Sequence, residues 1–141
     1  MSHFTRLDRA SITSVKAFEE ACKELGFTDI RQNTTIQDYS GKAAKVDVAA
    51  SAPGARYSVA IQKNAAGKFD MIADWWGVRT RDRNLYPVME RIGAFGSDTD
   101  IQDAFLRTTT KHTLTTHYRR LGFMARVTED EQHNIKVSLT R

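Results

Sequence analysis

The stretch FDMIADWWGV, residues 69–78, decides how the centre of this chain is expected to fold. Every second residue of Phe69–Ala73 is apolar, which is the period of a β-strand with one buried face. Two adjacent tryptophans then precede Gly77, a residue that favours a chain reversal. If the strand alternation continues, Trp75 joins the buried face and Trp76 points the opposite way. The pair is therefore expected to divide between the core and the surface.

Further strand-like stretches lie upstream of this segment. Alternating and β-branched residues occupy 30–38, 43–50 and 56–62, and the strand that contains Phe69 extends over 68–74. Turn-forming residues separate them: Ser40-Gly41, Pro53-Gly54 and Asn64 to Gly67. Short turns between consecutive strands favour antiparallel pairing, so residues 30–74 predict a continuous antiparallel meander.

A helix is expected on each side of the meander. The first covers residues 14–25, with Ser14 as its N-cap. Its apolar residues recur at spacings of three and four: Val15, Phe18, Cys22 and Leu25. The second begins at Asp98 or Thr99 and ends at Leu121. Its many threonines lower intrinsic helix propensity, so tertiary packing has to stabilise it.

Both helices are expected to end in the same way. Glu-Leu-Gly-Phe at 24–27 and Arg-Leu-Gly-Phe at 120–123 each place a glycine where a helix C-cap favours a left-handed residue. These two tetrapeptides, which share Leu-Gly-Phe, are compatible with an internal repeat of a helix-to-strand unit and also with coincidence.

A closing hairpin and an edge strand complete the expected fold. The region around Ala125 and Val127 is expected to pair with 135–139 across a polar turn, and residues 3–7 to add an edge strand. The result is a single α+β domain over residues 1–141. It consists of a mainly antiparallel meander sheet with two principal helices packed on one face.

Composition narrows the class of protein. The chain has 141 residues, 40% of them hydrophobic and 27% charged, which is typical of a globular domain. Its apolar runs are far shorter than the ~20 residues of a membrane helix, and the first nine residues lack a signal-peptide core, so it is expected neither to span a membrane nor to be secreted. Cys22 is the only cysteine and is expected to be a core residue.

No catalytic signature is present in the sequence. The phosphate-binding loop and the serine nucleophile motif are both missing, and the four histidines show no spacing typical of a metal site. Asp70 and Asp74 lie about 13 Å apart on a strand, too far for a glycosidase pair. Asp74 is instead expected to accept hydrogen bonds from turn amides. His3 is interpreted as an edge-strand residue or as part of a polar site near Asp74. We expect no enzymatic activity, metal or cofactor.

The net charge of +4 is accompanied by a local group of arginines. Arg79, Arg81 and Arg83 follow Trp76 closely, and an exposed tryptophan beside arginines is typical of protein-binding hot spots. The same composition suits base stacking over a basic groove, so RNA or single-stranded DNA is the alternative partner. Burial of Trp76 under residues 84–98 is the third interpretation. The candidate partner-binding residues are therefore Trp76, Arg79, Arg81 and Arg83.

Several of these motifs together resemble one known family. The opening Met-Ser-His-Phe, the Leu-Gly at 25–26, the Asp-Tyr-Ser-Gly turn at 38–41 and above all residues 69–78 are similar to the hypothetical chloroplast reading frame number thirty-five family. Members of this family occur in chloroplast genomes, cyanobacteria and bacteriophages. The resemblance covers most of the chain, whereas residues 79–100 and the threonine-rich helix depart from it.

The resemblance implies a role without an established enzymatic activity. Genes for similar proteins lie among genes for AAA-type ATPases and small ferredoxin-like proteins. This setting implies a non-enzymatic subunit, adaptor or assembly factor that binds a protein of a larger complex. The expected compartment is the plastid stroma or the cytoplasm of a bacterium or phage host.

Overall fold

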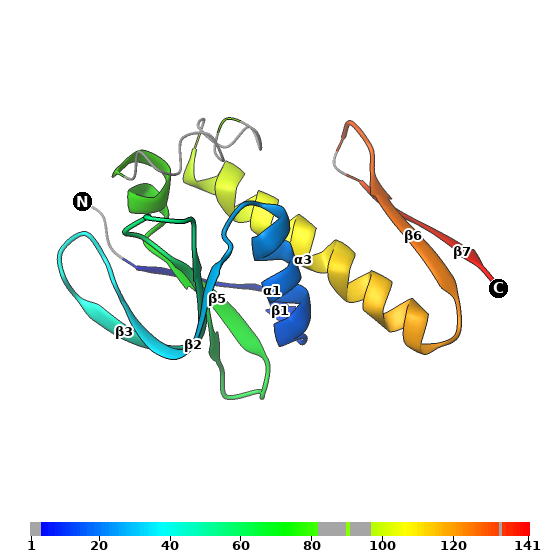
Figure 1. Cartoon of the computed structure of the whole chain (residues 1–141), viewed down its shortest axis with the longest axis horizontal. Helices are drawn as coiled ribbons and strands as arrows, with labels where there is room; N and C mark the ends of the chain where they lie inside the picture. Colours follow the sequence, from blue (N-terminus) through cyan, green and yellow to red (C-terminus); the bar gives the residue numbers. More distant parts are fainter. Residues whose placement is uncertain (1–3, 82–89, 91–96, 133) are drawn as a thin grey trace.

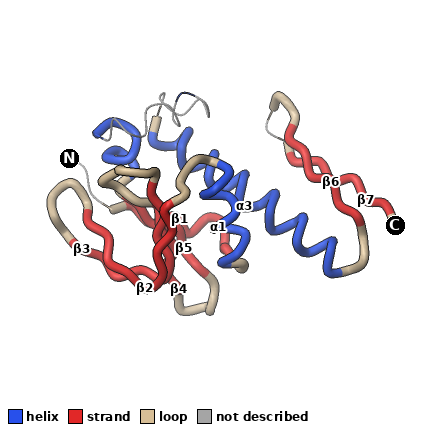
Figure 2. Tube along the Cα trace, in the orientation of Figure 1, coloured by secondary structure: helices blue, strands red, loops and turns tan. Residues whose placement is uncertain are grey.

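The computed structural model describes residues 4–81, 90, 97–132 and 134–141, and its arrangement is shown in Figure 1 and Figure 2. In chain order its elements are β1 (Thr5–Ile12), α1 (Val15–Glu24), β2 (Asp29–Gln37), β3 (Ala43–Ser51), β4 (Val59–Lys63), β5 (Phe69–Ala73), η1 (Gly77–Arg81), α3 (Asp98–Arg120), β6 (Met124–Glu129) and β7 (Ile135–Thr140). The α+β class, with an antiparallel meander and two principal helices, is confirmed.

The main sheet has five strands in the order β1-β5-β4-β3-β2. Strands β2, β3, β4 and β5 pair consecutively, and each of these pairings is antiparallel, so the expected meander is confirmed. Strand β1 pairs with β5, and its register shifts between Leu7 and Ile12. The expected edge strand therefore exists and extends further along the chain than residues 3–7.

The main core lies between the sheet and the two helices. Phe18 and Cys22 of α1 and Phe105 of α3 are fully buried there, and the ring of Phe105 lies 4.9 Å from the ring of Phe27 in an edge contact. The same cluster contains Phe18, Leu25, Val59, Ile61 and Met71. Phe69 packs against the cluster but is only partly buried, because it lies at the first position of β5.

The expected N-cap of α1 is confirmed, because the Ser14 hydroxyl accepts a hydrogen bond from the Ala17 amide. The second helix, α3, begins at Asp98, one of the two expected starts, and Ser97 caps it by accepting from the Asp100 amide. At the other end Gly26 and Gly122 have φ values of 92° and 87°, a left-handed conformation that glycine adopts without steric cost. The two Leu-Gly-Phe segments therefore form the same local cap, but the strands that follow belong to different sheets.

The hairpin of β2 and β3 curls over the second face of the sheet. Asn33 in β2 has a φ of +46°, a left-handed conformation that asparagine tolerates better than most residues. Beyond it, Ile36 and Val46 cluster with three residues of the sheet's other face: Ala49, Ala60 and Ile72. The far edge of the sheet is thereby brought toward the opposite edge.

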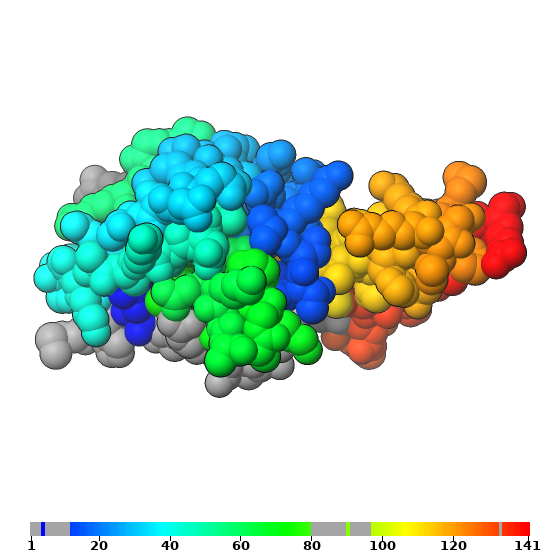
Figure 3. Space-filling model, turned by 90° about the horizontal axis from the view of Figure 1, so that it is seen from below, coloured from blue at the N-terminus to red at the C-terminus, as the bar shows by residue number. Residues whose placement is uncertain are grey.

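The C-terminal hairpin is separate from the main sheet. Strands β6 and β7 form a two-stranded sheet that packs on α3, and the two lie at the far end of this helix in Figure 1. Figure 3 shows the same segments projecting from the body of the molecule. Among the described residues, no helix is long and apolar enough to cross a membrane.

Candidate functional site

A buried carboxylate organises the end of β5. Asp74 is 1% exposed, and its two oxygens accept hydrogen bonds from two backbone amides. Oδ2 accepts from the Tyr39 amide at 2.8 Å, and Oδ1 accepts from the Gly77 amide at 3.0 Å. The expectation that Asp74 binds turn amides is confirmed. One side chain thus connects the turn of the β2–β3 hairpin with the helical segment after β5.

The hairpin turn itself is fixed by a second carboxylate. Asp38 accepts a hydrogen bond from the Ser40 hydroxyl at 2.6 Å and another from the Lys42 amide at 2.9 Å. These bonds, led by that of Ser40, lower the pKa of Asp38 below its ordinary value, with further contributions from the backbone of Ser40 and Phe4. Because Asp38 remains ionised near neutral pH, the turn that carries Tyr39 is held in one conformation.

An aromatic pair results from these two anchors. The rings of Tyr39 and Trp76 lie 5.8 Å apart with an angle of 80° between their planes, which is an edge-to-face contact. Tyr39 is 49% exposed, and Trp76 is partly buried. We call Tyr39, Asp74 and Trp76 the aromatic corner. It presents two large aromatic side chains at the surface on a backbone that is fixed beneath them.

Trp75 is buried and Trp76 is partly exposed, but a helical turn rather than strand alternation separates their side chains. Strand β5 ends at Ala73, and Trp75 and Trp76 begin a helical turn that continues into η1, so strand alternation does not apply to them. Trp75 is nevertheless 2% exposed and contacts Phe105. Successive helical residues point about 100° apart. This rotation turns Trp76 toward Tyr39 while Trp75 enters the core.

Gly77 permits close packing at the corner. A Cβ atom at this position would lie 3.0 Å from the ring of Tyr57 and 3.1 Å from the carboxylate carbon of Asp74. A larger residue would therefore require one of these side chains to shift by a few tenths of an ångström. The glycine expected at a chain reversal is favoured here by close contacts with Tyr57 and Asp74.

The arginines expected to surround Trp76 have different positions. The Nε of Arg79 donates a hydrogen bond to the Asp98 carboxylate at 2.7 Å, within an ion pair between η1 and the start of α3. The backbone of Arg81 ends η1, but its side chain is not among those described. Arg83 and His3 lie outside the described residues. Arg79 is the one arginine of the group whose side chain can be placed, and it connects two elements beside the aromatic corner.

Tyr39 is a residue of the site that the sequence patterns do not indicate. Its segment, Asp-Tyr-Ser-Gly, is recognisable in the sequence only as a turn and as part of a family resemblance. An aromatic residue flanked by polar turn residues is expected at the surface rather than in the core. This is the feature of the sequence from which Tyr39 could be proposed as a site residue. Its proximity to Trp76 depends on the curl of the hairpin, and local sequence patterns do not predict this curl.

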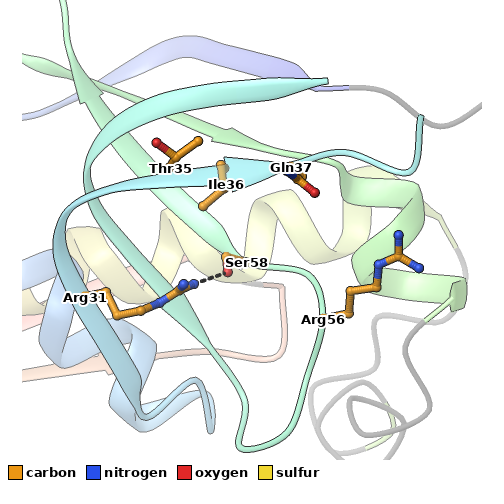
Figure 4. Close-up of a pocket in the computed structure, with 6 residues that line it drawn as sticks. All are labelled: Arg31, Thr35, Ile36, Gln37, Arg56 and Ser58. Carbon is orange, nitrogen blue, oxygen red and sulfur yellow. Dashed lines mark hydrogen bonds between the residues drawn. The ribbon is translucent and has the colours of Figure 1, made fainter. Parts of the chain in front are cut away.

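A separate surface cavity lies at the edge strand β2. It has a volume of about 200 Å³, and the residues that line it are Arg31, Thr35, Ile36, Gln37, Arg56 and Ser58 (Figure 4). Arg31 donates a hydrogen bond to the Ser58 hydroxyl at 2.9 Å, and the Arg56 guanidinium is directed away from Ser58 toward the other side. The two guanidinium groups do not converge on one point, so the cavity is not arranged to bind a single anion.

The other polar residues singled out in the sequence have structural partners or are buried. Asp70 is mostly buried and accepts a hydrogen bond from the Asn64 side chain at 3.0 Å, which fixes the β4–β5 turn. Cys22 is buried in the core, and burial raises the pKa of its thiol. Within the described part of the chain, no three His, Cys, Asp or Glu side chains are grouped so that they could hold a metal ion.

Comparison of the chain with protein-family models, with curated proteins and with solved structures found no match.

Proposed function

We propose that this chain is a non-enzymatic accessory domain that binds another protein through the aromatic corner. The observation that supports this proposal is the edge-to-face pair of Tyr39 and Trp76 at the surface. Tyrosine and tryptophan are enriched in binding hot spots because they combine a large apolar area with few rotatable bonds.

The aromatic corner is held in place before any partner binds, which favours its use as a binding surface. Tyr39 is attached through its own amide to Asp74, and Trp76 lies within the helical segment whose Gly77 amide binds the same carboxylate. A surface that is ordered before binding loses less conformational entropy when a partner docks. The aromatic corner therefore has both the residue types and the rigidity of a protein-binding site.

Charge at the rim of the corner favours a partner with acidic groups. The Arg79 side chain is 20% exposed and its charge is offset by the ion pair with Asp98, so the charge that would attract such a partner has to come from the next arginines. Arg81 and Arg83 follow it in sequence and remain part of the proposed surface. We expect these charges to affect the association rate and its salt dependence more than the final affinity.

The resemblance to the chloroplast reading frame family supports the same function. It implies a partner within a larger complex, with an AAA-type ATPase as the first candidate, and a location in the plastid stroma or in a bacterial or phage-host cytoplasm. An adaptor of this kind needs no active site of its own, because nucleotide hydrolysis belongs to the partner.

Site-specific photo-crosslinking tests the proposal. A benzophenone amino acid in place of Tyr39 should give a discrete crosslinked product with a protein in an extract of the source cells. Trp76→Ala in the same protein should remove that product, whereas Leu121→Ala should retain it. Leu121 is the matched control because its apolar side chain is 56% exposed at the far end of α3. Equal crosslinking by both variants would contradict binding through the aromatic corner.

A further inference from the structure

The net positive charge of this protein comes from one end of the chain. Residues 106–141, which we call the C-terminal arm, contain seven of the 21 Lys and Arg residues and three of the 17 Asp and Glu residues. The remaining 105 residues contain fourteen of each kind, so they have no net formal charge. The whole net charge of +4 therefore belongs to the arm, which projects from the body of the molecule in Figure 3.

The two faces of the hairpin in this arm differ in character. The residues directed toward α3 are partly buried, and most are apolar: Ala125, Val127, Glu129, Ile135 and Val137. The outer face is exposed and carries Met124, Arg126, Thr128, Lys136, Ser138 and Thr140. These side chains face one another in cross-strand pairs, Arg126 with Ser138 and Thr128 with Lys136. The outer face thus has two cations, three hydroxyl groups and no carboxylate.

Two of the three acidic residues of the arm have structural partners away from this face, and the third, Glu131, is exposed in the β6–β7 turn. Glu129 lies on the inner face and forms ion pairs with Arg107 at 2.9 Å and Lys111 at 3.3 Å of α3. Asp130 accepts hydrogen bonds from the amides of Gln132 and Asn134 within the β6–β7 turn. The carboxylates at positions 129 and 130 are therefore used to attach and shape the hairpin.

Additional cations surround the other end of the hairpin. Arg119 and Arg120 are exposed at the end of α3. The guanidinium of Arg141 lies 4.7 Å from the centre of the Phe123 ring, which keeps this charge beside the start of β6. Three further cations thus lie where α3 ends and β6 begins, in addition to the two on the outer face of the hairpin.

We propose that the outer face of the β6–β7 hairpin binds duplex DNA, with the hairpin in the major groove. Arginine, lysine, serine and threonine are the side chains that donate hydrogen bonds to phosphate and sugar oxygens. The major groove of B-form DNA is about 12 Å wide and admits a two-stranded β-ribbon. The hairpin has six residues in each strand, or about 20 Å, and its outer face carries donors along both strands.

Other polyanionic partners fit this face less well. A protein interface is expected to have a central aromatic anchor, and the outer face has none. An anionic membrane favours a broad apolar face beneath a basic one, whereas Met124 is the single large apolar residue here. Duplex RNA has a major groove too deep and narrow for side chains to enter. Duplex DNA remains the partner that matches both the charge and the shape.

Fluorescence anisotropy with a labelled DNA duplex of about 20 base pairs tests this proposal, with salt varied between about 50 and 200 mM. The double variant Arg126→Ala/Lys136→Ala should bind about tenfold more weakly and show a salt slope smaller by about two. The matched control is Lys63→Ala/Lys68→Ala, which removes the same charge from the exposed β4–β5 hairpin and should leave affinity and slope unchanged.

The outcomes of this experiment separate the alternatives. Equal weakening by the two double variants would overturn the proposal, because it would indicate binding by net charge alone. Tighter binding of an RNA duplex of the same sequence would overturn it as well, as would retention on anionic vesicles without binding to DNA. Circular dichroism of each variant confirms that the hairpin is intact. If the alanine variant unfolds, Arg126→Gln/Lys136→Gln is measured instead and should give the same loss.

Discussion

The backbone amide of Tyr39 donates a hydrogen bond to the carboxylate of Asp74 over 2.8 Å, although 35 residues separate the two in sequence. The same carboxylate caps the helical segment that follows β5 by accepting from Gly77. This single buried side chain therefore determines where the hairpin turn lies relative to Trp76. Its replacement is the most direct test of how the aromatic corner is held.

Asp74→Asn should destabilise the domain by about 1 to 3 kcal/mol, the usual cost of leaving a buried polar group without a partner. The asparagine side chain has one acceptor oxygen, whereas the carboxylate has two. One of the two backbone N–H groups would therefore face the NH2 group of the asparagine and lose its acceptor. Urea unfolding monitored by tryptophan fluorescence measures the loss. Asp29→Asn at the exposed start of β2 serves as the control and should change stability by less than about 0.5 kcal/mol.

The two tryptophans should differ in their contribution to stability. Trp75→Ala removes a side chain that is 2% exposed and should cost about 3 to 5 kcal/mol. Trp76→Ala removes a partly buried ring and the edge contact with Tyr39, so a loss of about 0.5 to 1.5 kcal/mol is expected. Thermal unfolding of both variants gives the comparison. A larger loss for Trp76 than for Trp75 would contradict the observed burial.

Phe69 should contribute less than a core phenylalanine. The sequence pattern places it with the buried residues, for which truncation to alanine costs about 3 to 5 kcal/mol. Because Phe69 is only partly buried at the edge of the cluster, Phe69→Ala should cost roughly half as much. Phe105→Ala, at a fully buried position of α3, is the matched comparison and should show the full loss in urea unfolding.

Stability should depend on pH through Asp38. The Ser40 hydroxyl and backbone donors lower the pKa of Asp38 in the folded state below its ordinary value of 3.8. Ionised Asp38 therefore stabilises the folded chain at pH values above this ordinary pKa. This contribution is lost as pH falls through the folded-state pKa. The difference in stability between the wild type and Asp38→Asn should therefore shrink below about pH 4. Urea unfolding at a series of pH values measures it.

Ser40→Ala provides the control for this titration. It removes the strongest of the hydrogen bonds to Asp38 and leaves the carboxylate in place. The acid-dependent part of the stability should be smaller in this variant than in the wild type. An unchanged pH profile in both variants would show that Asp38 does not link stability to pH.

Local patterns were sufficient to predict the elements of this fold. Period-two alternation and turn residues located β2 to β5, and the Ser14 cap and the Leu-Gly-Phe segments located the helices. These signals act over a few residues and are readable in a single sequence. The helical turn at Trp75 was not predicted, because the Asp74 carboxylate that caps it also depends on a distant hairpin for its second bond.

The candidate site was predicted in part. Trp76 lies at the surface corner, but its aromatic neighbour is Tyr39, whose position depends on the left-handed residue Asn33 and on the curl of β2 and β3.

Helix α3 was predicted without a clear apolar face to show how it packs. The threonines of α3 give no clear apolar face, and the helix is held by α1 on one side and by the hairpin on the other. Both features come from tertiary contacts between distant segments.

The curl of the β2–β3 hairpin also has a consequence for the order of folding. We expect Tyr39 and Trp76 to meet only after the four consecutive strands have paired and the hairpin has closed over the second face of the sheet. Contacts between residues far apart in sequence cost more loop-closure entropy, so their formation is expected late in folding. A partner that binds this pair would therefore select completed molecules, and its binding would shift the equilibrium away from incompletely folded ones.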